Sequence, residues 1–220
     1  MKKYLIVILG VLVASAVGAE IPPAIDQRLI DAATRGDVAN VKGLLAQGAS
    51  VQARDGQGWT ALMAATHANQ VAVAAVLIAA GSDVNARDNK KDSPYLYAGA
   101  EGRLEILRLT LAAGADLRST NRFGGTALIP AAEKGHVENV RELLKTKIDV
   151  NHVNDLGWTA LMETAMKKNR GANHTEITKL LLAAGADPNI PDHKGMTPLA
   201  HAEQAGNHEI AALLKAAGGH

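Results

Sequence analysis

Two residues of this 220-residue chain, Glu163 and His201, have the types that general acid–base catalysis uses. A carboxylate beside an imidazole orients the ring, and the ring exchanges protons near neutral pH. Both residues hold the same place in successive copies of a repeated motif, so we expect them to face one another across a boundary. No nucleophile and no metal-ligand spacing accompanies them. We therefore predict a structural polar pair, and an enzyme such as a hydrolase built on the two residues is the less favoured alternative.

The other residues with chemical potential are scattered. Histidines lie at positions 67, 136, 152, 174, 193, 208 and 220, without a His-x-x-x-His pair or a carboxylate cluster. The chain has no cysteine, which removes disulfides, thiolate nucleophiles and cysteine-type zinc sites. We expect no enzymatic activity, no metal site and no cofactor.

The N-terminal residues predict export. Lys2 and Lys3 precede an apolar run and a small-residue stretch that ends at Ala19. The run is shorter than the roughly 20 residues that a membrane-spanning helix needs, and the small residues fit a cleavage site. We predict a secretory signal peptide of bacterial type over residues 1–19, cut after Ala19, and a periplasmic or secreted protein. An uncleaved N-terminal tether, which would make the protein a structural element of the cell envelope, is the alternative.

Charge limits the class of partner. Removing residues 1–19 takes two lysines from the 23 basic residues and leaves 22 acidic ones, so the mature chain is close to neutral. Nucleic-acid binding depends on neutralising phosphates with basic side chains, and this balance argues against it. We expect no stable membrane insertion after cleavage.

A motif recurs at a fixed interval in the chain. Thr60, Ser93, Thr126 and Thr159 follow one another at 33 residues, and Thr197 comes 38 residues later. Each hydroxyl is expected to cap the first helix of a helix pair. Glycines end the second helix of most copies, as a left-handed C-terminal position prefers; they lie at positions 48, 81, 114 and 185. Lys147 holds this place in the fourth copy and is expected to cost about 1 kcal/mol relative to glycine.

These motifs resemble ankyrin repeats. The Thr-Pro-Leu-like starts, the Gly-His-Val-Glu step at residues 135–138 and the Gly-Ala-Asp-Val-Asn-like ends carry the resemblance over about residues 24–220. It implies an all-α repeat solenoid of helix-turn-helix pairs joined by β-hairpin-like loops, forming a single domain over residues 20–220. The expected units are 24–54 (a cap), 55–87, 88–120, 121–153, 154–191 and 192–220 (a cap), and residues 167–176 form an insertion loop in the fifth.

The resemblance also implies a function, because ankyrin repeats hold protein partners on a concave face of loops and inner helices. We predict a monomeric, non-catalytic protein-binding scaffold whose partner the sequence does not identify. A narrower alternative is an inhibitor or immunity protein for an exported enzyme or toxin. The expected contact residues are Gln57, Trp59, His67, Lys90, Asp92, Arg122, Phe123, Glu133, Lys134, Leu156, Trp158 and Met166.

The large aromatic residues favour binding. Trp59, Phe123 and Trp158 are the only tryptophan and phenylalanine residues, and all three fall in the predicted loops. Exposed aromatic residues and arginines dominate interface hot spots. A tryptophan just before the capping residue can instead cover the adjacent hairpin, and both interpretations stay open.

Tyr95 and Tyr97 stand where other copies carry small or aliphatic residues, so we expect them to pack. Pro130 lies inside a first helix, where it lacks one N–H donor. It either opens the binding site or distorts the helix without effect.

Overall fold

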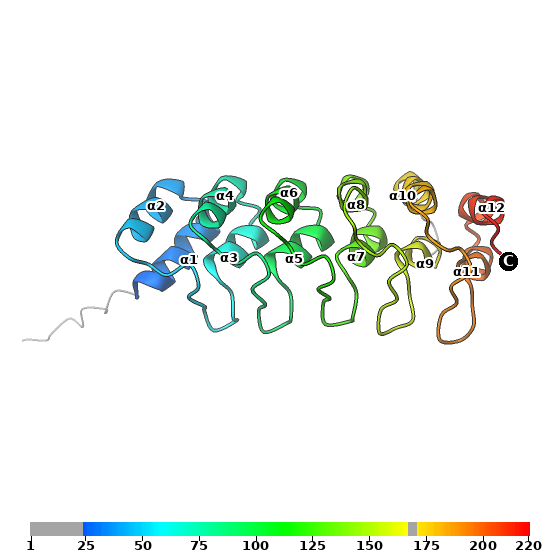
Figure 1. Cartoon of the computed structure of the whole chain (residues 1–220), viewed down its shortest axis with the longest axis horizontal. Coiled ribbons are helices and arrows are strands. Elements are labelled where there is room, and N and C mark those ends of the chain that lie inside the picture. Colours follow the sequence, from blue (N-terminus) through cyan, green and yellow to red (C-terminus); the bar gives the residue numbers. More distant parts are fainter. Residues whose placement is uncertain (1–23, 167–170) are drawn as a thin grey trace, which may run out of the picture.

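The structure is a computed structural model that describes residues 24–166 and 171–220. This part of the chain contains twelve α-helices and no strand (Figure 1). The predicted signal peptide, its cleavage after Ala19, and residues 167–170 of the insertion lie outside the described residues. The predicted insertion loop over residues 167–176 is wrong for its second half, because α10 (Ala172–Ala183) begins within it. The helices are α1 (Ile25–Arg35), α2 (Val38–Ala46), α3 (Ala61–His67), α4 (Val71–Ala79), α5 (Pro94–Ala100), α6 (Leu104–Ala112), α7 (Leu128–Glu133), α8 (Val137–Leu144), α9 (Ala160–Ala165), α10 (Ala172–Ala183), α11 (Pro198–Ala205) and α12 (His208–Ala216).

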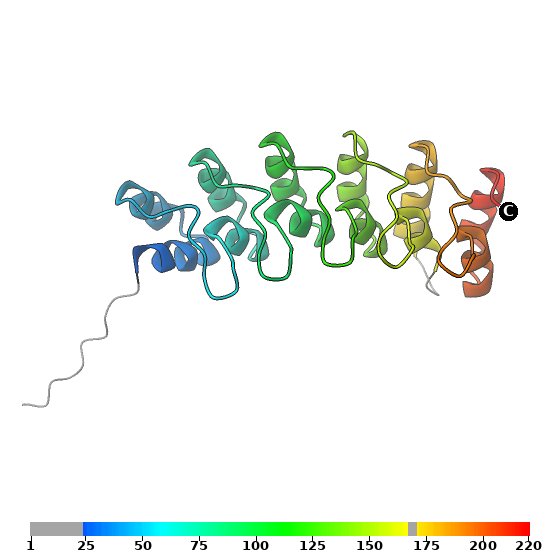
Figure 2. The same cartoon turned by 60° about the horizontal axis from the view of Figure 1, so that its bottom comes forward.

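The helices form two parallel rows. The even-numbered helices make an outer row, the odd-numbered helices make an inner row, and the loops between repeats all project from the side of the inner row (Figures 1 and 2). Each helix packs on the other helix of its pair and on its counterparts in the neighbouring repeats. The predicted all-α repeat solenoid is therefore confirmed. Within the described residues, no helix combines the length and the apolar character needed to cross a membrane.

One elongated core runs through the stack. Its buried residues are mainly leucine and alanine from both rows, and they extend from Leu29 in α1 to Leu214 in α12. Small alanines on the inner helices allow close approach, and the leucines of the outer helices fill the space above them. Tyr95 is fully buried in this core, as expected of a packing residue. Since a single helix pair cannot bury its apolar face, each repeat depends on its neighbours.

The predicted N-terminal caps are confirmed in four repeats. The hydroxyls of Thr60, Ser93, Thr159 and Thr197 accept a hydrogen bond from the backbone N–H three residues later, at 3.1 to 3.3 Å. The prediction is wrong for Thr126. Its helix α7 starts one residue later, and its hydroxyl is buried without a hydrogen-bond partner among the described residues.

Pro130 explains this exception. In the other four repeats, the N–H four residues after the cap donates to the cap carbonyl at 2.8 to 3.1 Å. Pro130 holds that position in the fourth repeat and has no N–H. The Ile129 N–H donates instead to the Thr126 carbonyl at 3.3 Å, so it is not available to the Thr126 hydroxyl. Starting α7 at Leu128 places Pro130 in the first turn, where a missing donor is tolerated.

The fourth repeat also ends its outer helix differently. Gly48, Gly81, Gly114 and Gly185 all have positive φ, as predicted, but Lys147 does not. The Thr146 hydroxyl donates to the Leu143 carbonyl at 2.6 Å and accepts from the Ile148 N–H at 3.2 Å. Because the Thr146 side chain ends α8 without a left-handed residue, Lys147 is not strained, and the predicted cost of lysine relative to glycine at this position is wrong.

Asparagine side chains bridge neighbouring repeats. Asn85, Asn151 and Asn189 each donate to the carbonyl of the next repeat's helix-ending glycine and accept from a backbone N–H beyond it. Arg118 is the equivalent residue at the junction of the third and fourth repeats, and Lys147 replaces its glycine partner. In the described residues this junction has no such bridge; it contains the ion pair of Arg108 with Glu142.

Candidate functional site

Each loop between repeats is held by the side chain of its first residue. Asp55, Asp88, Asn121, Asn154 and Asp192 accept, through one side-chain oxygen, the backbone N–H groups two and four residues later at 2.8 to 3.1 Å. Such turns need aspartate or asparagine, whose short side chains reach their own backbone. The fifth residue of each loop is thereby fixed beside the inner helices. We call this place the inner loop position; it is held by Trp59, Asp92, Gly125, Trp158 and Met196.

A groove of about 550 Å³ runs along the loops and inner helices of the second to fifth repeats. Ten of the twelve predicted contact residues line it. Gln57 and Met166 do not: Gln57 is exposed on a loop, and Met166 is half-buried at the end of α9. The ten are Trp59, His67, Lys90, Asp92, Arg122, Phe123, Glu133, Lys134, Leu156 and Trp158.

An aromatic stack forms the N-terminal wall of the groove. The ring centroid of His67 lies 4.0 Å from that of Trp59 and 3.7 Å from that of Tyr97. The Trp59 indole N–H donates to the Asp88 carboxylate in the next loop at 3.1 Å. Trp59 therefore covers a neighbouring hairpin and lines the groove at the same time. Burial lowers the pKa of His67, which favours a neutral ring in the stack.

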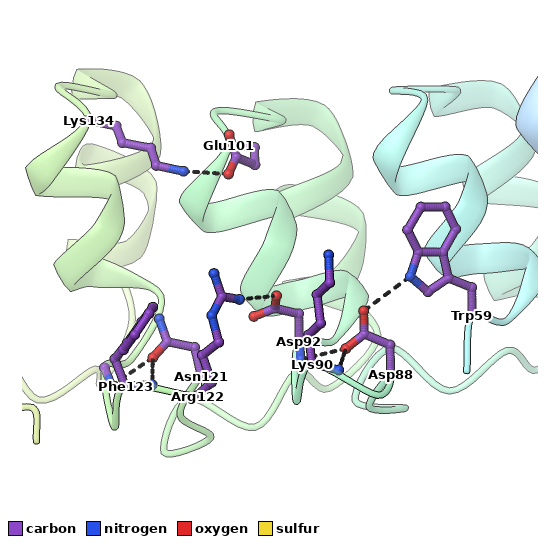
Figure 3. A network of polar contacts seen from close by, with 10 residues as sticks. Trp59, Asp88, Lys90, Asp92, Glu101, Asn121, Arg122, Phe123 and Lys134 are labelled. Atoms are coloured by element: carbon purple, nitrogen blue, oxygen red, sulfur yellow. Dashed lines mark hydrogen bonds and ion pairs between the residues drawn. The ribbon is translucent and has the colours of Figure 1, made fainter. Parts of the chain in front are cut away.

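Two ion pairs join the third and fourth repeats across the groove (Figure 3). Arg122 Nη1 lies 3.0 Å from Asp92 Oδ2 on the loops, and Lys134 pairs with Glu101 at the ends of the inner helices. The Arg122 guanidinium also lies over the Phe123 ring, 4.8 Å from its centroid. Burial raises the pKa of Asp92, and the nearby Arg122 opposes that rise.

The C-terminal part of the groove carries exposed apolar side chains. Phe123 is 49% exposed and Leu156 is 45% exposed, and Trp158 lies beside them. Large apolar side chains at this exposure are typical of interaction sites when they cluster in a groove. Trp158 Nε1 forms no hydrogen bond in the described part of the chain.

The expected pair of Glu163 with His201 must be corrected. His201 Nε2 lies 2.9 Å from Asp192 Oδ2, so its partner is a carboxylate of its own repeat. The loop before α11 folds back so that Asp192 faces this inner helix, and Asp192 rather than Glu163 therefore reaches His201. Glu163, which is 5% exposed, lines the groove instead. Since Asp192 is the counterpart of Asp88, its engagement with His201 also explains why Trp158 lacks the contact that Trp59 makes.

Sequence reasoning missed how Gly58, Gly124 and Lys91 determine the contacts between neighbouring loops. Backbone hydrogen bonds join adjacent loops: the Asn89 N–H donates to the Gln57 carbonyl at 3.1 Å, and the Asp155 N–H donates to the Phe123 carbonyl at 3.0 Å. A Cβ added at Gly58 or Gly124 would lie 3.0 Å from the donating nitrogen of the next loop.

Lys91 is the counterpart of Gly58 and Gly124 in the third repeat, and it carries a Cβ at a φ of 65°. The corresponding bond between its loop and that of Arg122 is missing among the described residues. The only sequence signal for this separation is a lysine at a position where the other four repeats have glycine. The groove lies beside these separated loops. The loops of the fifth and sixth repeats also lack the bond, yet Gly157 there still approaches the His193 nitrogen closely.

The arrangement is suited to binding. No group of three or more histidine, aspartate or glutamate side chains able to hold a metal ion occurs in the described residues. The groove joins apolar surface to charged groups that are held by neighbouring repeats. Such a mixture of apolar surface and polar groups is typical of protein interfaces.

Comparisons with known proteins agree with this architecture. A family model described as ankyrin repeats (3 copies) matches residues 29–121 and 95–192. A crystal structure of an ankyrin repeat domain from Acinetobacter baumannii AYE is similar at a TM-score of 0.84 and 56% identity, over 87% of this chain and 98% of that one. A crystal structure of the ankyrin repeat protein EF0377 is similar at a TM-score of 0.83 and 42% identity, over 86% and 97% of the two chains. No curated protein matches the chain.

Proposed function

Because the chain belongs to the ankyrin repeat family, whose domains are generally protein-interaction scaffolds, we propose that it is a non-catalytic protein that binds a protein partner in the groove of its second to fifth repeats. The observation that carries the proposal is the exposure of Phe123 and Leu156 beside Trp158. Side chains of this size would be expected in the core if stability alone determined their place. Their position on the loops favours contact with another molecule.

The proposal concerns a protein partner, since the chain carries no excess of basic residues for nucleic acid. We further propose that binding takes place in the periplasm or outside a bacterial cell. The basic start, the short apolar run and the small residues ending at Ala19 support export.

Affinity capture tests the function. The full chain, expressed with its N-terminal segment and a C-terminal tag, is recovered from exported fractions at physiological salt, and bound proteins are identified. We expect one specific exported partner, and we expect Arg122→Ala and Trp158→Ala to lose it without a large change in melting temperature. Repeated captures that recover no specific protein would contradict the proposal.

Mass spectrometry of the exported protein tests its location independently. A mature N-terminus at Glu20 supports cleavage after Ala19 and a released protein. A chain that keeps residues 1–19 and fractionates with the membrane would refute the released form while leaving the binding function open.

A further inference from the structure

We infer that the groove recognises a basic side chain of its partner, an arginine or lysine that enters beside Gly125 between Trp158 and the Asp92 carboxylate. This inference rests on the proposed function and adds the chemistry of the partner. Asp92, Tyr97, Gly125, Pro130 and Trp158 all line the groove, and we call the part of it at Gly125, between the third and fifth repeats, the Gly125 hollow.

Space for such a side chain exists because of Gly125. This glycine does not have positive φ, and an added Cβ would meet its nearest neighbours, on Asn121 and Ile129, at 3.5 to 3.6 Å, which is ordinary van der Waals contact. The backbone therefore does not require glycine here. The second and fifth repeats place tryptophan at the same inner loop position. An indole at Gly125 would fill the hollow, and its absence leaves room beside Trp158.

The walls of the Gly125 hollow suit a cation on an apolar stem. Pro130 and Ile129 offer apolar surface for the methylene groups of arginine or lysine, which such side chains bury while the charge stays in polar surroundings. Trp158 and Tyr97 present aromatic rings, and tryptophan is the strongest partner in cation–π contacts. The chain already uses this contact nearby, where Arg122 lies over Phe123.

Charge at the groove favours a positive partner over a negative one. Among the described residues, its lining includes five carboxylates (Asp88, Asp92, Glu101, Glu133 and Glu163) and three lysine and arginine side chains. Two of those cations, Arg122 and Lys134, form ion pairs with two of the carboxylates, Asp92 and Glu101, so the pairing leaves the excess of two carboxylates unchanged.

Asp92 is the acid best placed to receive the incoming charge. Its Oδ2 contacts Arg122, and no hydrogen bond to Oδ1 occurs in the described residues. Burial disfavours the charged form of this carboxyl, so a second cation would stabilise it. Arginine can satisfy the carboxylate and stack on an aromatic ring at the same time.

Peptide selection tests the inference. A library of random linear peptides displayed on phage is selected against the full chain, and selected sequences are synthesised with a fluorescent label for anisotropy titrations. We expect the peptides to share an arginine or lysine, and its replacement by glutamine to weaken binding about tenfold or more. Affinity should also fall as salt is raised.

Filling the Gly125 hollow supplies the matched control. Gly125→Trp should abolish peptide binding, whereas Met196→Trp places the same residue at the inner loop position of the sixth repeat, outside the groove, and should leave binding unchanged. Asp92→Asn removes the charge and keeps the shape of the side chain, so it should weaken the binding of basic peptides by a similar factor. It provides a second test of the inference if Gly125→Trp lowers the melting temperature.

Three results would overturn the inference: peptides anchored by uncharged aromatic residues, equal binding by wild type and Gly125→Trp, or no selected peptides at all. Each leaves the capture of a native exported partner as a separate measurement. A partner that is captured and released by Trp158→Ala but not by Gly125→Trp would uphold the function and reject the hollow.

Discussion

Replacing Lys91 by glycine should stabilise the protein. Lys91 adopts a φ of 65°, while the equivalent Gly58, Gly124, Gly157 and Gly195 take the same region without a side chain. The left-handed conformation costs a residue with a Cβ about 1–2 kcal/mol, and the greater freedom of glycine in the unfolded chain offsets about 0.5–1 kcal/mol of the gain. Relief of backbone strain alone is therefore worth about 0.5–1 kcal/mol.

A second contribution comes from the neighbouring loop. Without the Lys91 Cβ, the Arg122 N–H can approach the Lys90 carbonyl as Asn89 approaches Gln57, and such a bond adds about 1 kcal/mol. The total of about 1.5–2 kcal/mol predicts a rise in melting temperature of roughly 3–8 °C for a domain of this size.

Circular dichroism during thermal unfolding measures the effect, and Lys90→Gly is the control. Both substitutions remove one lysine charge, but Lys90 does not have positive φ, so its replacement should not stabilise. Hydrogen exchange adds a local reading, because the Arg122 amide should become protected in Lys91→Gly. A Lys91→Gly protein that melts no higher than Lys90→Gly, with an unprotected Arg122 amide, would refute the reasoning. Since the loops would close on the groove, partner affinity should fall as stability rises.

Three further outcomes follow from single contacts. Thr159→Val should lower the free energy of unfolding by about 1 kcal/mol, because it removes a helix cap. Thr126→Val should be neutral or stabilising, because the buried Thr126 hydroxyl has no partner among the described residues. Urea titrations measure both variants, and equal losses of stability would contradict this prediction. Burial lowers the pKa of His67, so the unfolded chain takes up the proton first as pH falls through 6.5, and the free energy of unfolding declines with acidification. His67→Phe removes this titration, so its melting temperature should drop less than that of the wild type between about pH 7 and about pH 5. His201→Ala should lower the melting temperature through loss of the Asp192 contact and leave partner affinity unchanged; unaltered melting with abolished binding would assign His201 to the interface.

The architecture was predictable because each repeat carries its own local signals. Thr60 and Thr159 cap helices whose apolar faces are legible in a single copy, and glycines such as Gly48 mark the turns. Agreement among copies reinforces each signal. Ten of the twelve predicted contact residues line the groove for the same reason, since their position in the repeat determines which side they face.

Features that depend on the path of the chain within one repeat were harder to predict. His201 bonds Asp192 because the loop returns a nearer acid than Glu163, and the repeat register alone cannot rank two acids by distance. Thr126 loses its cap because Pro130 removes a donor four residues away, an effect that a cap motif read in isolation does not include. The hollow was missed because it depends on Gly125, a residue whose importance lies in an absent side chain.

The missing asparagine bridge at Arg118 has a consequence for how unfolding spreads. Every other junction from the second repeat onward has an asparagine bridge of neutral hydrogen bonds. The third and fourth repeats are joined instead by the buried Asn139 amide, which donates to the Ala98 and Gly99 carbonyls, and by three ion pairs, which salt screens. In a linear array the weakest coupling limits how far order propagates. We expect the array to unfold as one unit at low salt and as two half-arrays, residues 24–120 and 121–220, at high salt, with the groove of the proposed binding function at the seam between them.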